Sequence, residues 1–374
     1  MESRFVNLSP GDPAPYFVAP TTTIPRFTFD TAAGRYLVLC FLGTVGDEAG
    51  EGALRAIAAH RRVFDDDKAS LFGVLIDPED QARNRVQESI PGIRFFLDHD
   101  LAISRRYGAV PHDAVAGQPV AVRRFWLVLD PALRILKLFP FPDSGADHAE
   151  LFNYLSALPA LDSYPGFTVQ APVLCLHSVF EPGLCEKLIS LYETHGGGES
   201  GFMREVNGKT VGVFDHSHKR RKDYTITDDD IIRITQARIK RRIVPEIARV
   251  HQFHVTRMER YIVSCYAAED GGHFRAHRDN TTKGTAHRRF AVSINLNAEF
   301  EGGEISFPEF GPRGFKPPPG GAVIFSCSLL HRVSKVTAGR RYAFLPFLYD
   351  EAAAKIREEN LGFLDAPAGG MQEA

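Results

Sequence analysis

Three side chains in the C-terminal half have the types and spacing of metal ligands: His277, Asp279 and His331. His277 and Asp279 alternate with Arg278, so on a β-strand their side chains would point to the same face. His331 follows the apolar run GGAVIFSC, and we expect it at the end of that strand. Two imidazoles with one carboxylate are the donor set of non-haem iron(II) sites, which leave metal positions open. Those open positions suit a bidentate 2-oxo acid and dioxygen.

A second candidate group is Arg341, ten residues beyond His331. An even spacing along a strand or hairpin can return its guanidinium to the same interior, where two hydrogen bonds would hold a carboxylate. Arg340 is the alternative, but it would face the opposite way. The spacing therefore favours Arg341 as the residue that binds an acidic group.

Two further histidines compete for these roles. His273 lies on the same alternation face as His277, but the residue two positions after it is Arg275, which is not a metal ligand. We therefore interpret His273 as a rim residue. His287 lies in the polar loop TTKGTAHRR, and we expect it to face solvent or line the substrate site rather than bind metal.

The elements that must position these residues follow residue 255, where apolar runs are separated by Gly, Pro and charged turns. No helical pattern separates the runs, which predicts an antiparallel barrel or jelly roll. Two stretches before it, 182–192 and 227–250, have helical spacing, and Thr227 with Asp230 resembles a capping box. The runs are RMERYIVSCY, RRFAVSINLN, GGEISFP, GGAVIFSC and RRYAFLPFLYD.

The first 160 residues instead alternate strand and helix patterns. RYLVLCFLG at 35–43 is a continuous apolar run, typical of a central strand covered on both faces. Two more buried-strand runs, 69–77 and 123–130, each end in Asp-Pro, a turn signal. Amphipathic helices are expected after Glu48 and at 147–158. This alternation predicts an α/β layer fold.

Length and composition place the chain among two-domain globular proteins. At 374 residues it exceeds a typical single core. The turn-rich stretch 161–172 separates the two patterns, so we expect domains at 1–162 and 170–352. A C-terminal tail at 353–374 ends in small and polar residues and is expected to fray.

Charge and cysteine content exclude several classes of protein. The formal net charge of −2 argues against a nucleic-acid-binding surface. The N-terminus has no signal-peptide pattern, and no apolar run is long enough to cross a bilayer. The five cysteines form no C-x-x-C pair, which is typical of reduced thiols. We therefore expect a cytoplasmic protein.

The segment 255–350 resembles the iron(II)/2-oxoglutarate-dependent oxygenases, and particularly their prolyl 4-hydroxylase-type branch. The matching pieces are YAAEDGGHFRAHRDN, RRFAVSINLN, FEGGEISFPEFG and KPPPGGAVIFSCSLLHRVSKVTAGRRYAF. The resemblance implies an α+β domain built on a double-stranded β-helix, which is a jelly-roll or cupin-like fold. It also implies an enzyme, a 2-oxoglutarate-dependent dioxygenase.

The same resemblance assigns roles to five residues. The ligands of Fe(II) would be His277, Asp279 and His331. Arg341 would bind the distal carboxylate of 2-oxoglutarate, and Tyr266 would donate its phenol to the same group. The tyrosine of the family lies slightly nearer the first histidine than Tyr266 does.

The reaction implied by the resemblance is hydroxylation of a C–H bond. Oxidative decarboxylation of 2-oxoglutarate would drive it, with dioxygen as the second co-substrate, ascorbate as an optional reductant, and succinate and carbon dioxide as products. Related halogenases lack the carboxylate ligand, so Asp279 favours hydroxylation. The expected substrate is a peptidyl side chain, with proline as one candidate, or a small molecule.

The N-terminal part resembles the peroxiredoxins and related thioredoxin-like domains, on LSPGDPAPYFVAP, FFLDHDLAISRRYGA and RRFWLVLD. The peroxidatic cysteine of that family belongs in the first turn after the first long strand, where this chain reads GTVGDEAGEGA. Cys40 lies inside the preceding strand, where a buried thiol is inert. We therefore expect a thioredoxin-like α/β domain without peroxidase activity, which serves as a scaffold, a recruitment module or the contact of a homodimer.

Two basic stretches, 216–224 and 238–250, are interpreted as solvated helix faces. Beside an active-site mouth they could instead receive an acidic or peptide substrate. Two other functions stay open for the whole chain. The missing cysteine disfavours a thiol peroxidase, and the three potential metal ligands with Arg341 disfavour a non-enzymatic scaffold.

Overall fold

A computed structural model of the chain describes residues 4–141 and 148–364. Its tertiary contacts divide the chain into two compact units. The first is Met1–Gln170 together with Pro308–Pro312, and the second is Ala171–Phe307 together with Arg313–Ala374. The first unit combines helices with a mixed sheet, whereas the described strands of the second pair antiparallel.

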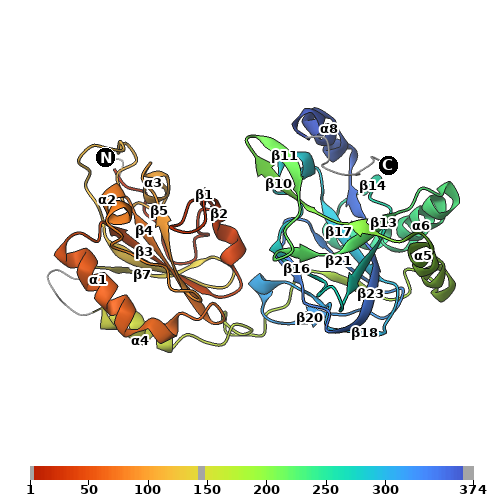
Figure 1. Ribbon diagram of the computed structural model, residues 1–374, viewed down its shortest axis with the longest axis horizontal. Coiled ribbons are helices and arrows are strands. Elements are labelled where there is room, and N and C mark those ends of the chain that lie inside the picture. The colour runs from red at the N-terminus through yellow and green to blue at the C-terminus, as the bar shows by residue number, and fades with distance from the viewer. Residues whose placement is uncertain (1–3, 142–147, 365–374) are drawn as a thin grey trace. The chain divides into compact units, whose positions relative to one another are not determined.

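The first unit is an α/β layer around one central sheet. Its elements are β1 (Val18–Ala19), β2 (Phe27–Thr28), η1 (Phe29–Ala32), β3 (Tyr36–Gly43), α1 (Glu48–Ala59), η2 (Arg61–Val63), β4 (Ala69–Leu75), α2 (Pro78–Ala82), β5 (Ile93–Leu97), α3 (Ala102–Arg106), β6 (Phe125–Leu129), β7 (Ile135–Pro140) and α4 (Ala149–Ser156), with η4 (Pro308–Phe310) from the second part of the unit. The sheet has the strand order β5-β4-β3-β6-β7 (Figure 1). β3 pairs in parallel with β4 and antiparallel with β6, so the long apolar run is the central strand, as expected.

Side chains of β3 alternate between the two faces of this sheet, as the pleat requires. Val38 and Cys40 belong to a cluster that α1 and α4 cover with Ile57 and Leu155. Figure 1 shows these two helices beside each other on the sheet. Stacked and edge-on aromatic rings form a second cluster: Phe17, Phe29, Phe72 and Phe96. β3 is consequently buried along its whole length.

The second unit is strand-rich and contains two main antiparallel sheets. Its elements are β8 (Leu174–Leu176), α5 (Pro182–His195), β9 (Gly198–Glu199), β10 (Phe202–Val206), β11 (Lys209–Val213), β12 (Lys219–Arg220), β13 (Lys222–Thr225), α6 (Asp229–Arg242), α7 (Val244–His251), β14 (Arg257–Glu259), β15 (Ile262–Ala267), β16 (His273–His277), η3 (Lys283–Thr285), β17 (Phe290–Asn295), β18 (Phe300–Glu301), β19 (Ile305–Ser306), β20 (Gly314–Phe315), β21 (Ala322–Ser326), β22 (His331–Val333), β23 (Ala338–Phe344), β24 (Phe347–Tyr349), α8 (Glu351–Asn360) and η5 (Leu361–Phe363). The larger sheet follows the order β14-β24-β17-β23-β15-β13-β9, with β18, β21 and β8 attached beside this path. The smaller sheet has the order β12-β16-β22-β19-β20, and β10 with β11 forms a separate hairpin.

Two helices support the larger sheet. Leu188 of α5 and Ile239 of α6 belong to one apolar cluster with Val263, Ile294 and Phe344 of the central strands. Figure 1 shows α5 and α6 side by side against the strands. This packing holds β15, β17 and β23 in place, and these strands carry several of the residues described below.

The stretch 227–250, expected to be helical, forms the two helices α6 and α7. The expected capping box of Thr227 and Asp230 is wrong, because the N-cap of α6 is Asp228. The side chain of Asp228 accepts hydrogen bonds from the N–H groups of Asp230 and Ile231. Aspartate is among the best N-cap residues, so the cap has moved by one position without loss of its function.

The basic stretch 216–224 forms strands, contrary to the expected helix face. It contains β12 and β13, and two of its cations, Lys219 and Arg221, are buried. The second basic stretch, 238–250, lies on α6 and α7, where Arg241 is exposed. The predicted solvated helix face is therefore wrong for 216–224. The two buried cations of that stretch are considered again below.

The tail expected at 353–374 begins inside a helix. Asp350 caps α8, and its side chain accepts a hydrogen bond from the N–H of Ala353 at 2.9 Å. Arg257 of β14 pairs with Glu351 and ties the start of this helix to the sheet. The expected fraying of the last residues concerns 365–374, which lie outside the described residues.

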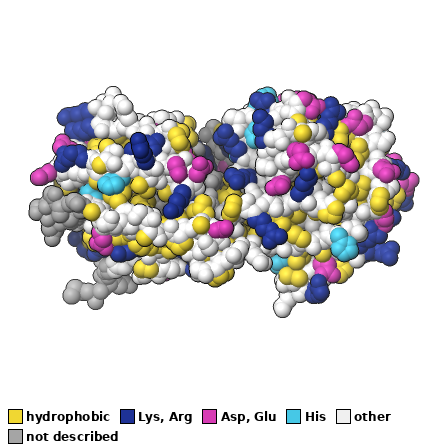
Figure 2. All heavy atoms as spheres, turned by 90° about the horizontal axis from the view of Figure 1, so that it is seen from below, with side chains coloured by type: hydrophobic (Ala, Val, Ile, Leu, Met, Phe, Trp, Pro, Cys, Tyr) yellow, Lys and Arg dark blue, Asp and Glu magenta, His cyan; other side chains and the backbone are white. Residues whose placement is uncertain are grey.

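The surface of the described chain carries mixed charge. Figure 2 shows one face, on which Lys and Arg side chains alternate with Asp and Glu and form no large patch of one sign. That face offers no basic surface of the kind that binds nucleic acid. Among the helices that the structure describes, none has the length and apolar character that a membrane span requires.

Candidate metal centre

The structure brings His277, Asp279 and His331 together. His277 is the last residue of β16 and His331 is the first of β22, and they are direct partners across these antiparallel strands. The centroids of the two rings lie 4.2 Å apart. Asp279 follows β16 by two residues, and its N–H donates to the carbonyl of Cys327 at 2.9 Å. Strand pairing thus sets the imidazoles side by side, although His331 starts a strand instead of ending one as expected.

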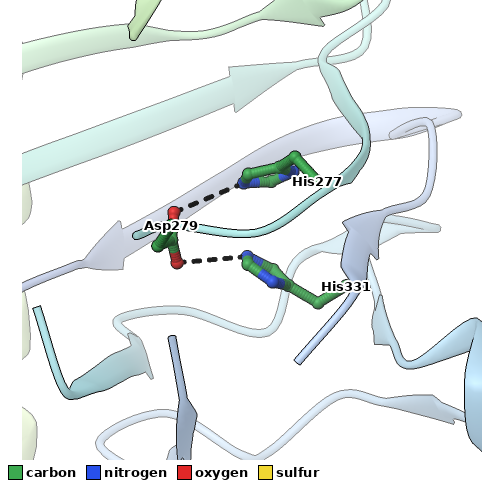
Figure 3. Close-up of side chains that lie close together, drawn as sticks. All are labelled: His277, Asp279 and His331. Carbon is green, nitrogen blue, oxygen red and sulfur yellow. Dashed lines mark ion pairs between the residues drawn. The ribbon is translucent and has the colours of Figure 1, made fainter. Parts of the chain in front are cut away.

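The carboxylate of Asp279 faces both imidazoles, with one oxygen directed toward each ring (Figure 3). Its Oδ1 is 3.5 Å from Nε2 of His277, and its Oδ2 is 3.4 Å from Nε2 of His331. One potential ligand atom from each of the three residues lies within 4.8 Å of the others. Such a cluster is compact enough for one cation to contact all three side chains.

Hydrogen bonds fix how the two imidazoles face the carboxylate. Nδ1 of His277 donates to the carbonyl of Arg275 at 2.7 Å, and Nδ1 of His331 donates to the carbonyl of Leu329 at 3.0 Å. A carbonyl only accepts, so Nδ1 carries the proton and the lone pair of a neutral imidazole is on Nε2. Both Nε2 atoms therefore present lone pairs where Asp279 presents a carboxylate. A set made only of acceptors fits a divalent cation.

The pKa values of the site agree with this arrangement. Burial, together with the neighbouring His331, lowers the pKa of His277 to about 4, so its imidazole is neutral near pH 7. Burial alone would raise the pKa of Asp279, but His331 and His277 outweigh it and hold this pKa well below its usual range. His277 and Asp279 thus have the protonation states that metal ligation needs.

Aromatic rings pack against the imidazoles. Phe274 stacks on His277 with ring centroids 3.5 Å apart, and Phe325 lies 4.6 Å from His331. Phe307 contacts Phe325 edge-on and is also buried. These rings hold the imidazoles in place and reduce the access of water to the cluster.

Arg341 lies on β23 directly opposite Tyr266 on β15, and both side chains are 1% exposed. Its Nε donates to Oδ1 of Asn295 at 3.0 Å, and one terminal nitrogen donates to Oγ of Ser293 at 2.8 Å. The other terminal nitrogen has no hydrogen-bond partner among the described residues. Arg340 is exposed and pairs with Glu269, so the two arginines face opposite ways, as their spacing predicts.

The two competing histidines lie outside the cluster. Nδ1 of His273 donates to the carbonyl of Gly271 at 2.8 Å, and the residue is partly buried. His287 is 2% exposed, and its Nε2 contacts Glu259 at 2.9 Å. The expectation that His287 faces solvent or lines the substrate site is therefore wrong, because Glu259 draws it into a buried ion network with Arg288.

Sequence reasoning missed several polar residues of this region. Ser293 and Asn295, which orient Arg341, alternate along the otherwise apolar strand β17. Polar residues at every second position of a buried strand are a detectable signal, because burial requires a partner for each of them. Lys219 and Arg221 gave no such signal, since a run of cations is usually solvated.

In the first unit, the turn after β3 is where the peroxiredoxin resemblance would place a peroxidatic cysteine, and an aspartate and an arginine interact there. Asp47 is the N-cap of α1 and accepts a hydrogen bond from the N–H of Gly50 at 2.9 Å. Arg124 donates two hydrogen bonds to the same carboxylate, at 3.0 and 2.6 Å. Cys40 lies inside β3, where burial raises the pKa of its thiol well above the usual value. A thiol in this state is a poor nucleophile.

Comparison with known families adds to this geometry. Residues 260–349 match the family model described as the 2OG-Fe(II) oxygenase superfamily. Residues 10–135 match the AhpC/TSA family model, so both resemblances expected from the sequence are confirmed.

The curated relatives that match part of this chain are named PKHD-type hydroxylases. A PKHD-type hydroxylase from Pseudomonas fluorescens is 37% identical over 91 aligned residues, and the match covers 22% of this chain and 39% of the relative. A PKHD-type hydroxylase from Synechococcus sp. is 30% identical over 89 residues, with the same coverage of 22% and 39%. The chain thus spans 39% of the length of these relatives.

Solved structures similar to this chain fall into the same two groups. A prolyl hydroxylase from Trichoplax adhaerens has a TM-score of 0.40 and 17% identity, covering 58% of this chain and 99% of its own. A prolyl-4-hydroxylase from Pseudomonas putida has a TM-score of 0.37 and 13% identity, covering 48% and 92%. A peroxidoxin from Mycobacterium tuberculosis has a TM-score of 0.33 and 19% identity, covering 41% and 100%.

Proposed function

We propose that the second unit is an Fe(II)- and 2-oxoglutarate-dependent oxygenase that hydroxylates a C–H bond. The observation that carries this proposal is the acceptor-only set of His277, Asp279 and His331, with one ligand atom of each within 4.8 Å of the others. It lies within the segment that matches the oxygenase family. The co-substrate would leave as succinate and carbon dioxide.

His277, Asp279 and His331 would hold Fe(II), which together with 2-oxoglutarate and dioxygen supplies the oxidising power for hydroxylation. Arg341 would bind the distal carboxylate of 2-oxoglutarate through its unpartnered terminal nitrogen, and Tyr266 would donate its phenol to the same group. Ser293 and Asn295 orient that guanidinium, and Phe274 with the other rings reduces the access of water to the imidazoles.

The two main sheets of the second unit are proposed to form the double-stranded β-helix of this enzyme class, which would place the metal ligands on its smaller sheet. The relatives are named PKHD-type hydroxylases, and similar structures are named prolyl hydroxylases, one of them in complex with a peptide fragment. We therefore propose a peptidyl substrate, with proline as the first candidate, and a small molecule as the alternative. Ascorbate as a reductant and a cytoplasmic location stay predictions.

The first unit is proposed to act without catalysis, as a scaffold, a recruitment module or the contact of a homodimer. Asp47 and Arg124 satisfy each other at the turn where a peroxidase would need a thiolate. The full-length protein should not consume hydrogen peroxide in the presence of dithiothreitol. Turnover of peroxide above a no-protein control would restore the peroxidase alternative.

The proposed function is tested by adding Fe(II) and then 2-oxoglutarate to the full-length protein without oxygen. We expect a weak visible charge-transfer band, which His277→Ala abolishes. His273→Ala is the matched control, because His273 lies four residues earlier on β16 and outside the cluster, and it should keep the band. Admission of oxygen should then produce succinate. Wild-type protein that gives neither band nor succinate would refute the oxygenase.

A further inference from the structure

A second buried guanidinium lies beside Tyr266. Arg221, between β12 and β13, is 7% exposed, and one terminal nitrogen donates to the phenol oxygen of Tyr266 at 3.3 Å. The central carbon of its guanidinium lies 5.7 Å from the centre of the Tyr266 ring, and that of Arg341 lies 5.3 Å from the same centre. The tyrosine that we expect to contact 2-oxoglutarate is therefore flanked by two arginines, one on β23 and one between β12 and β13.

Both guanidinium groups keep a buried N–H without a partner. Arg221 also donates to Asp223 at 2.7 Å and to Ser200 at 3.1 Å, but its Nε has no partner among the described residues. The same holds for one terminal nitrogen of Arg341. Unsatisfied donors on a buried cation are costly, and a ligand with several acceptor oxygens would satisfy them.

The charges around Arg221 do not balance. Its carboxylate partner Asp223 is shared with Arg260 at 3.4 Å and also accepts a hydrogen bond from Ser264 at 2.6 Å. Lys219 is buried as well, its Nζ donates to neutral oxygens of Ser200 and Gly201, and burial lowers its pKa well below the usual value. The two guanidinium groups of Arg221 and Arg260 thus share the single carboxylate of Asp223. Such an excess of positive charge is stabilised by a bound anion.

Arg341 has no carboxylate of its own either. Its hydrogen bonds within the described chain go to neutral groups, Ser293 and Asn295. Burial, and then the positive charge of Arg221, lower the pKa of Arg341 to about 10, so both guanidinium groups stay charged near pH 7 and repel each other. An anion shared between them would remove this repulsion.

We propose that Arg221 binds the distal carboxylate of 2-oxoglutarate together with Arg341, with the phenol of Tyr266 between them. This inference rests on the proposed function and adds a residue to the co-substrate site. One guanidinium suffices to form a bidentate pair with one carboxylate. Two guanidinium groups and a phenol make the site strongly selective for a dicarboxylic 2-oxo acid over a monocarboxylic one.

A purely structural role for Arg221 is the competing explanation. Asp223 would keep Arg260 and Ser264 as partners if Arg221 were removed, so the ion pair alone does not require a second arginine. A structural role predicts that removal of Arg221 affects all 2-oxo acids alike. The binding role predicts that only acids with a distal carboxylate are affected.

The test compares two ligands on full-length protein loaded with Mn(II) without oxygen, with dissociation constants measured by calorimetry. 2-Oxoglutarate carries the distal carboxylate, and 2-oxopentanoate has the same number of carbons without it. We expect Arg221→Gln to weaken 2-oxoglutarate at least about 30-fold and to change 2-oxopentanoate less than about 2-fold. Arg260→Gln, which removes the other cation of Asp223, is the matched control and should leave the ratio between the two ligands unchanged.

Two further variants separate direct contact from positioning of Tyr266. If Arg221 acts only through the phenol, Arg221→Gln, Tyr266→Phe and the double variant will weaken 2-oxoglutarate equally. Direct contact predicts that the double variant is weaker than either single one. Arg221→Lys keeps the charge but lacks the planar pair of guanidinium donors. Its affinity for 2-oxoglutarate should lie between those of wild type and Arg221→Gln.

Each result decides the inference. Equal weakening of both acids, or no weakening of 2-oxoglutarate, by Arg221→Gln would overturn it while leaving the oxygenase intact. Wild-type protein that binds Mn(II) but neither acid would instead overturn the proposed function, and the inference with it. An unaltered Mn(II) affinity of Arg221→Gln shows that this variant is folded. If Arg221→Gln does not fold, the two acids are compared on Arg221→Lys instead.

Discussion

The two units each place a carboxylate shortly after a strand, but the hydrogen-bond partners of the two carboxylates differ. Asp47, after β3, receives the N–H of Gly50 and two hydrogen bonds from Arg124. Asp279, after β16, faces the Nε2 atoms of His277 and His331, whose protons are on Nδ1. The first carboxylate meets donors from its own protein, whereas the second meets acceptors.

This difference shows how a structural carboxylate is distinguished from a ligand. A carboxylate whose oxygens accept hydrogen bonds from protein donors has a structural role. Asp47 is such a residue, because it caps a helix. A carboxylate that faces two imidazole Nε2 atoms adds to the potential ligand atoms around one point, where a cation can bind. The donor count around each aspartate, rather than its burial or its distance from a strand, separates the two cases.

The largest expected effect is on metal binding. Asp279→Ala should weaken Fe(II) binding more than about 100-fold, because changes to residues that only support ligands already cost 10- to 100-fold. Asp47→Ala should leave the Fe(II) affinity unchanged. Titration of both proteins with Fe(II) without oxygen checks the pair, and equal affinities would erase the contrast between the two carboxylates.

The next effect concerns the co-substrate. Arg341→Gln should weaken 2-oxoglutarate about 100-fold, since it removes a buried charged donor of a carboxylate. Arg340→Gln is the neighbouring control, and its exposed side chain should make no difference to the affinity. Calorimetry on the Mn(II)-loaded proteins measures both. A stronger effect of Arg340→Gln would contradict the proposal, because it would place the co-substrate site on the opposite face of β23.

A smaller effect is expected at Asp66, another carboxylate of the first unit that arginine satisfies. Burial alone would raise the pKa of Asp66, but the hydrogen bonds from Arg94 and Ser70 lower it to about 2. A pKa below the unfolded value of about 3.9 adds stability above that value, which is lost as the pH falls toward 2. Wild type should exceed Asp66→Asn by about 2 kcal/mol at pH 6, and the gap should close near pH 2.

Unfolding by urea at several pH values measures that gap. Asparagine is a suitable replacement because residue 66 has a φ of 66°, in the left-handed region that asparagine tolerates. The amide also keeps an oxygen that can accept from Arg94. A gap that stays constant from pH 6 to pH 2 would mean that the carboxylate charge contributes nothing to folding.

The smallest effect is on the stability of the first unit. Asp47→Ala removes the N-cap of α1 and should cost about 1 kcal/mol of unfolding free energy, the usual value for such a cap. Glu51→Ala is the control, because Glu51 lies on the same helix and makes only an exposed pair with Arg55. Thermal unfolding of both variants checks the difference, and equal midpoints would show that Asp47 is not acting as a cap.

The features that could be predicted were those that leave a periodic pattern of apolar and polar residues in the sequence. The apolar run of β3 and the strand-rich second unit follow from periodicity, because burial on one or both faces leaves a pattern. The grouping of His277 with Asp279 follows from alternation. His331 and Arg341 were found through their place after apolar runs and through a family resemblance, since periodicity says nothing about which strands pair.

Features that depend on a distant partner could not be predicted. His287 lies in a polar stretch, yet Glu259 from another strand makes its burial favourable. Lys219 and Arg221 belong to a cationic run, and their burial depends on Asp223, Ser200 and Tyr266. The cost of burying a charge is set by contacts that a single stretch of sequence does not contain.

The two imidazoles are oriented by main-chain carbonyls, each two residues earlier in the chain. Every amino acid supplies such a carbonyl, so point mutations at Arg275 or Leu329 leave the anchors intact. The side chains next to the two histidines can consequently change without realigning the imidazoles. If the cluster holds a metal as proposed, its geometry is thereby insulated from substitutions at the positions that flank its ligands.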